Sequence, residues 1–126
     1  MTAINEPLNL GDLLKYEEDC LRYSRGVATV AAGQKLALGT VVGRDTTTTK
    51  LKQLDPLAID GSEKPVGVIL SDVDATLIDV DGALLLNRHA VLASNCVVWP
   101  AGITAAAKTA ATDALANLGI LIRQSA

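Results

Sequence analysis

The chain has 126 residues, a formal net charge of −3 and 49% apolar residues, which fits one domain large enough to bury a hydrophobic core. It contains no Phe, 2 Tyr and 1 Trp, so the core must be built from Val, Leu, Ile and Ala. The basic residues form no run and no aromatic side chains alternate with them, which disfavours direct binding of nucleic acid. No apolar stretch approaches the roughly 18 residues that a membrane-spanning helix needs.

The N-terminal segment differs from the rest of the chain. Turn-forming residues interrupt short apolar pieces, and a charged run follows at residues 15–25, so neither strand nor helix periodicity persists. The apolar content is too high for a purely solvating tail, which predicts an extended arm over residues 1–25 that becomes ordered on docking. A short helix over residues 10–20, capped by Asp12, is the local alternative. The remaining residues, 26–126, then form one β-rich domain. No signal peptide is recognisable, which predicts synthesis in the cytoplasm.

The first half of the domain consists of short apolar segments separated by turn residues. β-Branched residues predict a strand over residues 26–32. A single strand is predicted over residues 32–43, bent at Gly39, because a glycine inside a strand marks a bulge, a corner or a close backbone approach. The four threonines at 46–49 are typical of an exposed hairpin tip. The lysines within residues 50–54 predict a solvated edge strand.

The second half of the β-region begins with a buried strand over residues 66–70, the expected partner of the bent strand. Residues 71–82 form a long acidic connection, with a short extended piece predicted at residues 76–78. The longest strand candidate follows over residues 83–94. The β-region ends at Pro100, which has no N–H for a ladder hydrogen bond.

One helix is predicted over residues 104–118, with Thr104 as its N-cap, an alanine-rich interior and Gly119 just beyond its end. A last short strand follows at residues 120–123. The buried stripe of the helix is predicted to be Ala107, Ala111, Ala114, Leu115 and Leu118. Together the elements predict an α+β fold that is mostly β: a small curved or partly closed β-structure with one C-terminal helix and an extended N-terminal arm. Small aliphatic residues bury little area each, so we expect the chain to form oligomers.

The strongest candidate for chemistry is an acidic group in the connection after the buried strand: Asp72, Asp74, Asp79 and Asp81. Its spacing departs from a calcium loop, because Gly82 directly follows the last acid and no carboxylate occurs in residues 83–93. A solvated acidic loop is the favoured interpretation. The alternative is a small metal- or ligand-binding β-domain that uses residues 72–81 together with His89.

The other polar residues give no catalytic constellation. His89 lies in a predicted strand without a nucleophile motif nearby, which favours a structural or interface role. Cys96 is flanked by apolar residues and fits a buried small hydrophobe, and Cys20 and Cys96 fit free thiols in a reducing compartment. The glycines lack the spacing of a phosphate-binding loop. We therefore expect no enzymatic activity, no cofactor and no bound metal.

Four segments share an order and spacing that carry a family resemblance. They are Glu6-Pro-Leu-Asn-Leu-Gly-Asp-Leu-Leu-Lys-Tyr-Glu-Glu18 with Tyr23-Ser-Arg25; Ala32-Gly-Gln-Lys-Leu-Ala-Leu-Gly-Thr-Val-Val-Gly43; Asp60-Gly with Val66-Gly-Val-Ile-Leu70 and Asp72-Val-Asp-Ala75; and Val97-Val-Trp-Pro-Ala-Gly102 with Leu118-Gly-Ile-Leu-Ile-Arg123. In this order they resemble the arm, first core strand, central block and C-terminal block of the head decoration proteins of tailed phages, the family of the lambda capsid-stabilising protein. The resemblance covers nearly the whole chain.

The resemblance implies a structural protein of the bacteriophage virion. Members of the family associate as homotrimers on the outer surface of the expanded capsid, where they hold adjacent major capsid protein subunits together. Their N-terminal arms order on the capsid and extend its sheet, which agrees with the arm predicted above. Trp99 and Pro100 are predicted for the trimer interface. Contact with the capsid is predicted for Leu10, Leu13, Leu14, Tyr16, Tyr23 and Arg25.

Overall fold

The computed structural model describes residues 13–17 and 24–124, and within these it is mostly β with one α-helix near the C-terminus, which confirms the predicted fold class. The strands are β1 (Leu14–Glu17), β2 (Arg25–Val30), β3 (Gln34–Leu36), β4 (Val41–Arg44), β5 (Leu51–Gln53), β6 (Pro65–Ile69), β7 (Val73–Ala75), β8 (Val80–Leu86), β9 (Ala90–Ala93) and β10 (Ile120–Arg123). The helices are the 3-10 helix η2 (Ser94–Cys96) and α2 (Ala105–Asn117). No helix in the described part of the chain is long and apolar enough to cross a membrane.

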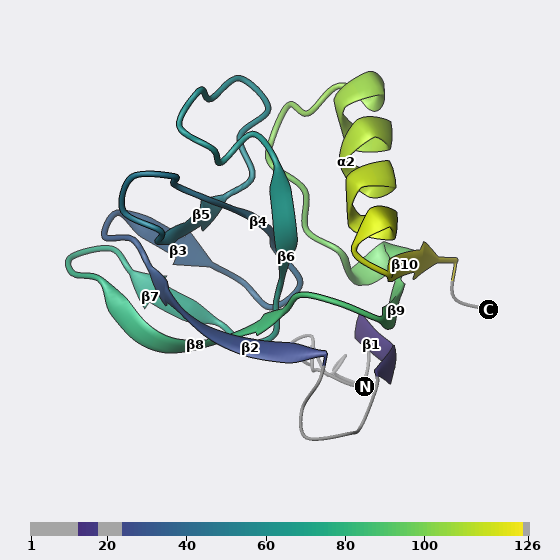
Figure 1. Ribbon diagram of the computed structural model, residues 1–126, viewed down its shortest axis with the longest axis horizontal. Coiled ribbons are helices and arrows are strands. Elements are labelled where there is room, and N and C mark those ends of the chain that lie inside the picture. Colours follow the sequence, from purple (N-terminus) through teal and green to yellow (C-terminus); the bar gives the residue numbers. More distant parts are fainter. Residues whose placement is uncertain (1–12, 18–23, 125–126) are drawn as a thin grey trace, which may run out of the picture.

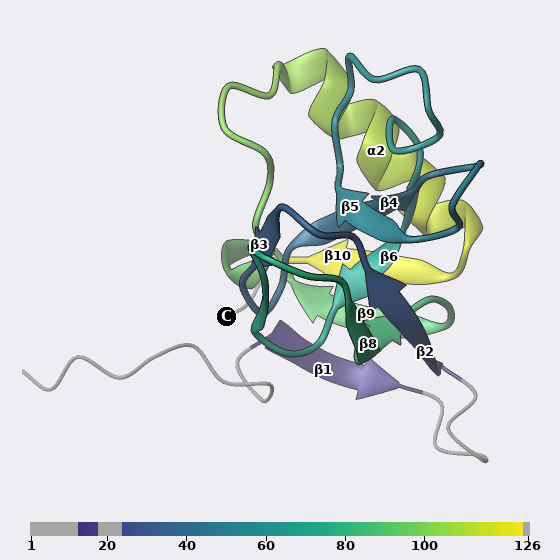
Figure 2. The same ribbon diagram turned by 90° about the vertical axis from the view of Figure 1, so that its left-hand side faces the viewer.

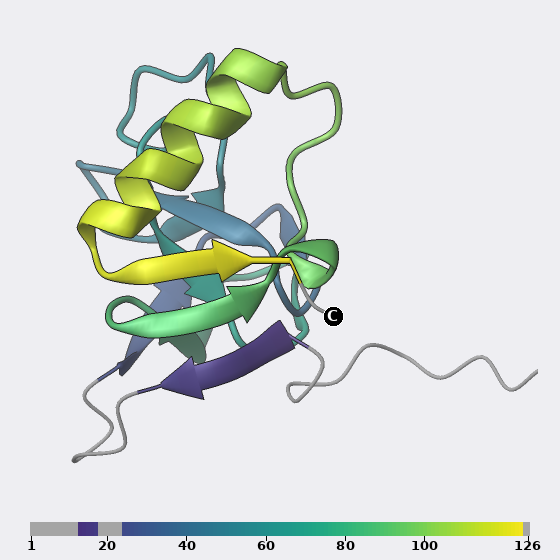
Figure 3. The same ribbon diagram turned by 90° about the vertical axis from the view of Figure 1, so that its right-hand side faces the viewer.

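The strands form a small barrel with two attached sheets (Figure 1). Strands β2, β5, β4, β6 and β8 close the barrel, and the seam between β2 and β5 consists of the single pair Val30 and Leu51. Strands β3 and β7 form a two-stranded ribbon, and β1, β9 and β10 form a three-stranded sheet. Helix α2 runs along the top of the molecule, with β10, β9 and β1 following below it in that order (Figures 2 and 3).

The barrel strands separate two hydrophobic clusters. One cluster fills the barrel, and the other lies between the barrel, the three-stranded sheet and α2. Neighbouring residues of one strand enter different clusters, because successive side chains of a strand point to opposite faces. On β4, β6 and β8, the residues that face α2 are Val41, Val68 and Leu86. Their neighbours that face the barrel interior are Val42, Ile69 and Leu85.

The prediction of one strand over residues 32–43 is wrong. The segment forms β3 and β4, which belong to different sheets and are separated by a turn at Gly39. Gly39 has φ +94°, which residues with a side chain rarely adopt, and a methyl group there would overlap the carbonyl oxygen of Cys96. The Gly39 amide donates to the Ile69 carbonyl oxygen at 2.9 Å, so the turn is tied to the end of β6.

Two other strand predictions are corrected in their extent. The segment predicted over residues 83–94 is split into β8 and β9, and His89 between them has φ +42°. The extended piece predicted at residues 76–78 occurs instead at β7. The alternative helix over residues 10–20 is not formed at residues 14–17, which are the strand β1. The rest of that predicted helix lies largely outside the described residues.

The predicted solvated edge strand is also wrong, because β5 pairs with β4 on one side and β2 on the other. Leu51 is fully buried, and Lys52 and Gln53 are half-buried. The strand at β6, the hairpin tip at residues 46–49 and the final strand β10 are confirmed.

Helix α2 is confirmed with its caps. The Thr104 hydroxyl accepts a hydrogen bond from the Ala107 amide at 3.1 Å, and Gly119 with φ +83° follows the helix. Within the predicted stripe, Ala111 and Leu115 are buried and contact the outer cluster. Ala107 and Ala114 are half-buried, whereas Leu118 is 37% exposed, so the buried face is narrower at the C-terminal end than predicted.

Gly67 allows β6 and β8 to approach closely, which gives a first testable prediction. A methyl group at Gly67 would overlap the Leu86 carbonyl oxygen and lie 2.9 Å from Leu85 Cδ1. We expect Gly67→Ala to lower the free energy of unfolding by about 1–3 kcal/mol, measured by urea denaturation. Gly26→Ala is the matched control, since its methyl group would meet the end of the Asn87 side chain, at 3.0 Å. Equal stability of the two variants would contradict the close approach.

Candidate functional site

The first described strand is anchored to the domain at both of its ends. Leu13, just before β1, is fully buried in the outer cluster. At the other end, Arg25 Nε and Nη2 donate to the two carboxylate oxygens of Glu17 at 2.7 and 2.6 Å. These hydrogen bonds raise the pKa of the Arg25 guanidinium, and both side chains are only 26% exposed. The ion pair therefore ties β1 to the start of β2.

Strand β1 forms one edge of the three-stranded sheet. It pairs antiparallel with β9, with Leu14 opposite Leu92 and Tyr16 opposite Val91. Leu14 packs against the outer cluster, whereas Tyr16 is 55% exposed. No described strand pairs with the opposite edge of β1. An unpaired strand edge presents backbone N–H and C=O groups to a partner.

The structure therefore brings together four of the six residues predicted to contact the capsid. Leu13 and Leu14 face the protein's own core, Tyr16 faces outward, and Arg25 is held by Glu17. Leu10 and Tyr23 lie outside the described residues. Sequence reasoning did not identify Glu17 as a partner of Arg25, because eight residues separate them and no local pattern pairs them. Capsid contact by these residues stays a prediction.

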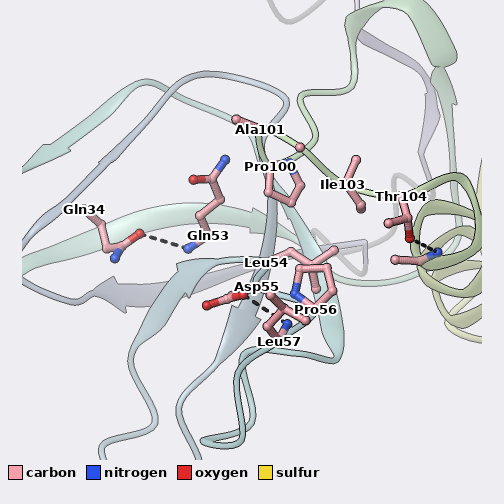
Figure 4. Close-up of a pocket in the computed structure, with 12 residues that line it drawn as sticks. Gln34, Gln53, Leu54, Asp55, Pro56, Leu57, Pro100, Ala101, Ile103 and Thr104 are labelled. Atoms are coloured by element: carbon pink, nitrogen blue, oxygen red, sulfur yellow. Dashed lines mark hydrogen bonds between the residues drawn. The ribbon is translucent and has the colours of Figure 1, made fainter.

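The predicted trimer-interface residues lie beside a groove of about 610 Å³ (Figure 4). Pro100 and Ile103 line one side of it, and Leu54 and Pro56 line the other. The preceding residue, Trp99, is half-buried against the outer cluster. The ammonium group of Lys108 lies 5.6 Å from the centroid of the Trp99 ring, within the range of a cation–π interaction. Leu57 at the rim is 92% exposed, so the groove offers apolar surface.

The acidic group of the sequence analysis serves local structure. Asp72 accepts a hydrogen bond from the Leu38 amide at 2.8 Å, and Asp81 accepts one from the Thr29 hydroxyl at 2.8 Å. Asp79 pairs with Lys50 and also accepts from the Ala32 amide at 2.7 Å. Asp74 accepts from the Thr76 hydroxyl at 2.5 Å and from the Thr76 amide at 3.2 Å. These carboxylates thus hold the turns around β7 in place.

No group of three His, Cys, Asp or Glu side chains in the described ranges is placed to hold a metal ion. His89 is exposed in the turn between β8 and β9, rather than within a strand as predicted. Cys96 is a buried free thiol, as predicted, and Cys20 lies outside the described residues.

A second set of carboxylates fastens the loops at the other end of the barrel. Lys52 Nζ lies 3.3 Å from Asp45 and 3.1 Å from Asp60, which links the β4–β5 hairpin to the β5–β6 loop. The Ser62 hydroxyl and amide donate to Asp60 at 2.6 and 3.0 Å, and these hydrogen bonds, with Lys52, lower the pKa of Asp60. Backbone amides of Thr48 and Thr47 lower the pKa of Asp45 in the same way.

The lowered pKa values predict a loss of stability in acid. Lys50 and the Ala32 amide lower the pKa of Asp79, and Thr76 lowers that of Asp74. A carboxylate whose pKa is lower in the folded protein stabilises the fold above its ordinary value of 3.8, and this contribution disappears as the pH falls through the folded value. We expect the urea midpoint to be constant above roughly pH 5 and to fall below it.

Asp74 and Asp79 are exposed and Asp60 is half-buried, so the effect of each is small and screened by salt. Asp60→Asn and Asp79→Asn should lower the midpoint at neutral pH and reduce its fall in acid. Asp113→Asn, on the exposed side of α2, makes the same change in net charge and is the control. If the urea midpoint of Asp60→Asn and of Asp79→Asn falls in acid as much as that of the parent chain, other groups cause the loss of stability.

Comparison with known proteins identifies the family. A search of curated proteins gave no match. The family model of the bacteriophage lambda head decoration protein D matches residues 3–120, which includes β1, the barrel, α2 and the start of β10. The match spans every buried residue of the two hydrophobic clusters, so the chain belongs to the family of the bacteriophage lambda head decoration protein D and is a structural protein of the phage capsid.

Proposed function

We propose that the protein binds as a homotrimer to the outer surface of the expanded phage head and clamps adjacent major capsid subunits, without catalysis. The observation that carries this proposal is the position of β1. The strand that follows the N-terminal segment has an outer edge that pairs with no described strand, and it is fixed to the domain by Leu13 and by the Glu17–Arg25 pair. A strand of the capsid can add to such an edge through main-chain hydrogen bonds.

The anchoring of β1 explains how an arm could clamp. Residues 1–12 precede Leu13, whose side chain is fully buried. A force on those residues is therefore passed to the core of the domain rather than to a loose linker. In this proposal Tyr16 contacts the capsid directly, and Leu13 and Arg25 hold the strand in position. Residues 1–25 remain the proposed docking arm, with residues 13–17 as its attachment to the domain.

The groove beside Trp99 and Pro100 supports the trimeric part of the proposal. A trimer with threefold symmetry needs two different surfaces on each subunit, and an apolar groove next to an exposed Leu57 is suited to receive a neighbouring subunit. Three arms on one rigid trimer bind with higher avidity than one arm alone, because the second and third contacts are intramolecular.

Removal of residues 1–12 tests the arm. The deletion spares Leu13 and β1, so the domain keeps its core. We expect the shortened protein to melt at the temperature of the full chain and to lose most of its co-sedimentation with expanded heads that lack decoration protein. The full chain is the positive control, and unexpanded heads are the negative control. Undiminished binding of the shortened protein would exclude residues 1–12 from the clamp.

Charge placed in the groove tests the trimer. We expect light scattering of the full chain to give three times the chain mass, and Pro100→Lys to give a smaller assembly, because the lysine would have to be desolvated in the interface. Leu77→Lys is the control, since Leu77 is 90% exposed in the β7–β8 turn, away from the groove. A monomeric full chain, or a trimer unaffected by Pro100→Lys, would contradict the proposed interface.

A further inference from the structure

We propose that the outer face of the three-stranded sheet β1–β9–β10 is a second capsid-binding surface, which receives an apolar patch of a capsid subunit with acidic groups at its edge. This inference rests on the proposed function and extends it, because it assigns capsid contact to residues of β9 and β10 that lie far from the arm in the sequence.

The pairing register places three apolar side chains in one row across this sheet. Val91 on β9 is opposite Tyr16 on β1 and opposite Leu121 on β10. The residues on either side of Val91 and Leu121, which are Ala90, Leu92, Ile120 and Ile122, belong to or pack against the outer cluster. Since side chains alternate between the two faces of a strand, the row Tyr16–Val91–Leu121 lies on the face that points away from the core.

The row is accessible in the described part of the molecule. Tyr16 is 55% exposed, Leu121 is 37% exposed, and Val91 between them is half-buried. The view from the right-hand side shows the three strands in front, with no other described element across them (Figure 3). An aromatic residue next to aliphatic residues on a rigid sheet is the composition expected at the centre of a protein interface.

The charges on the three strands favour an acidic partner. Arg123 is exposed, and it points to the outer face because it follows the inward Ile122. The only carboxylate on these strands is that of Glu17, and it is paired with Arg25. The face is therefore apolar with the basic Arg123 at its edge.

The attachment of the arm brings this face to the capsid. Leu13, the first described residue, is three residues from Tyr16, a distance of at most about 10 Å along an extended chain. Leu13 cannot move away while its side chain is buried in the core. When residues 1–12 engage a capsid subunit, the outer face of the sheet is therefore held close to that subunit, and its apolar row can be covered without further ordering of the backbone.

The test uses full-length variants that keep the strands. Val91→Thr with Leu121→Thr removes apolar surface from the row and retains strand-forming residues. Arg123→Glu reverses the charge at the edge and provides an independent readout if the double variant folds poorly. The matched control is Leu77→Thr with Ile78→Thr, which removes side chains that are 90% and 72% exposed at the other end of the molecule. Expanded heads of the phage that encodes this chain, stripped of decoration protein, are the probe for titrated co-sedimentation.

We expect the row variant to bind the heads about tenfold more weakly than the parent chain. Arg123→Glu should bind more weakly at low salt and respond less to added salt, because one attractive charge pair is lost. The control should bind as the parent does. Parent-like affinity of folded row and charge variants overturns the inference, and a fall in the mass of the free row variant overturns it by assigning the face to contacts between copies. A parent chain that fails to bind heads overturns the proposed function itself.

Discussion

Burial on both faces of three barrel strands is the constraint on which the rest of the structure depends. In β4, β6 and β8, neighbouring residues enter opposite hydrophobic clusters, so a shift in the register of one of these strands would displace side chains from both clusters. The chain has no Phe, and its largest fully buried side chains are Leu and Ile. A barrel filled only with such residues is thin, and its outer surface must also be covered. Helix α2, β9, β10 and β1 provide this cover, which is why the first and the last described strands pack on the same cluster.

The elements that the sequence predicts correctly are those with local signals. Strand β6 is a short apolar run, and α2 has a capping threonine, an alanine-rich interior and a glycine after its end. The prediction for β5 is wrong because a lysine in a strand indicates an exposed edge. The Lys52 side chain does reach the surface, where it bonds Asp60, but the backbone of β5 pairs with a strand on both sides. The sequence predicts only a bend at Gly39. The close contact of Gly39 with Cys96 joins residues that are far apart in the sequence, so no local pattern reveals it.

The candidate site shows the same division. Tyr16 and Arg25 are recognisable from the family resemblance, but the role of Glu17 depends on β1 lying beside β2. Val91 and Leu121 become neighbours only through the parallel pairing of β9 with β10, which no period in the sequence reveals. The acidic residues around β7 have the composition of a chemical site, yet the described carboxylates accept hydrogen bonds from backbone amides, threonines and Lys50. A cluster of acidic residues in a barrel with many loops can thus stabilise turns through hydrogen bonds.

The central place of β9 between the first and the last described strands has a kinetic consequence. Leu14 pairs with Leu92, and Ile120 pairs with Ala90, so this sheet joins residues from both ends of the chain. Such contacts close long loops and form late in folding, after more local pairings such as the β4–β5 hairpin. On the ribosome, β1 must wait for nearly the whole chain to be synthesised before its partner is available. Strand β1, which we propose to attach the arm that binds the capsid, therefore pairs last within the protein. The barrel can form before it.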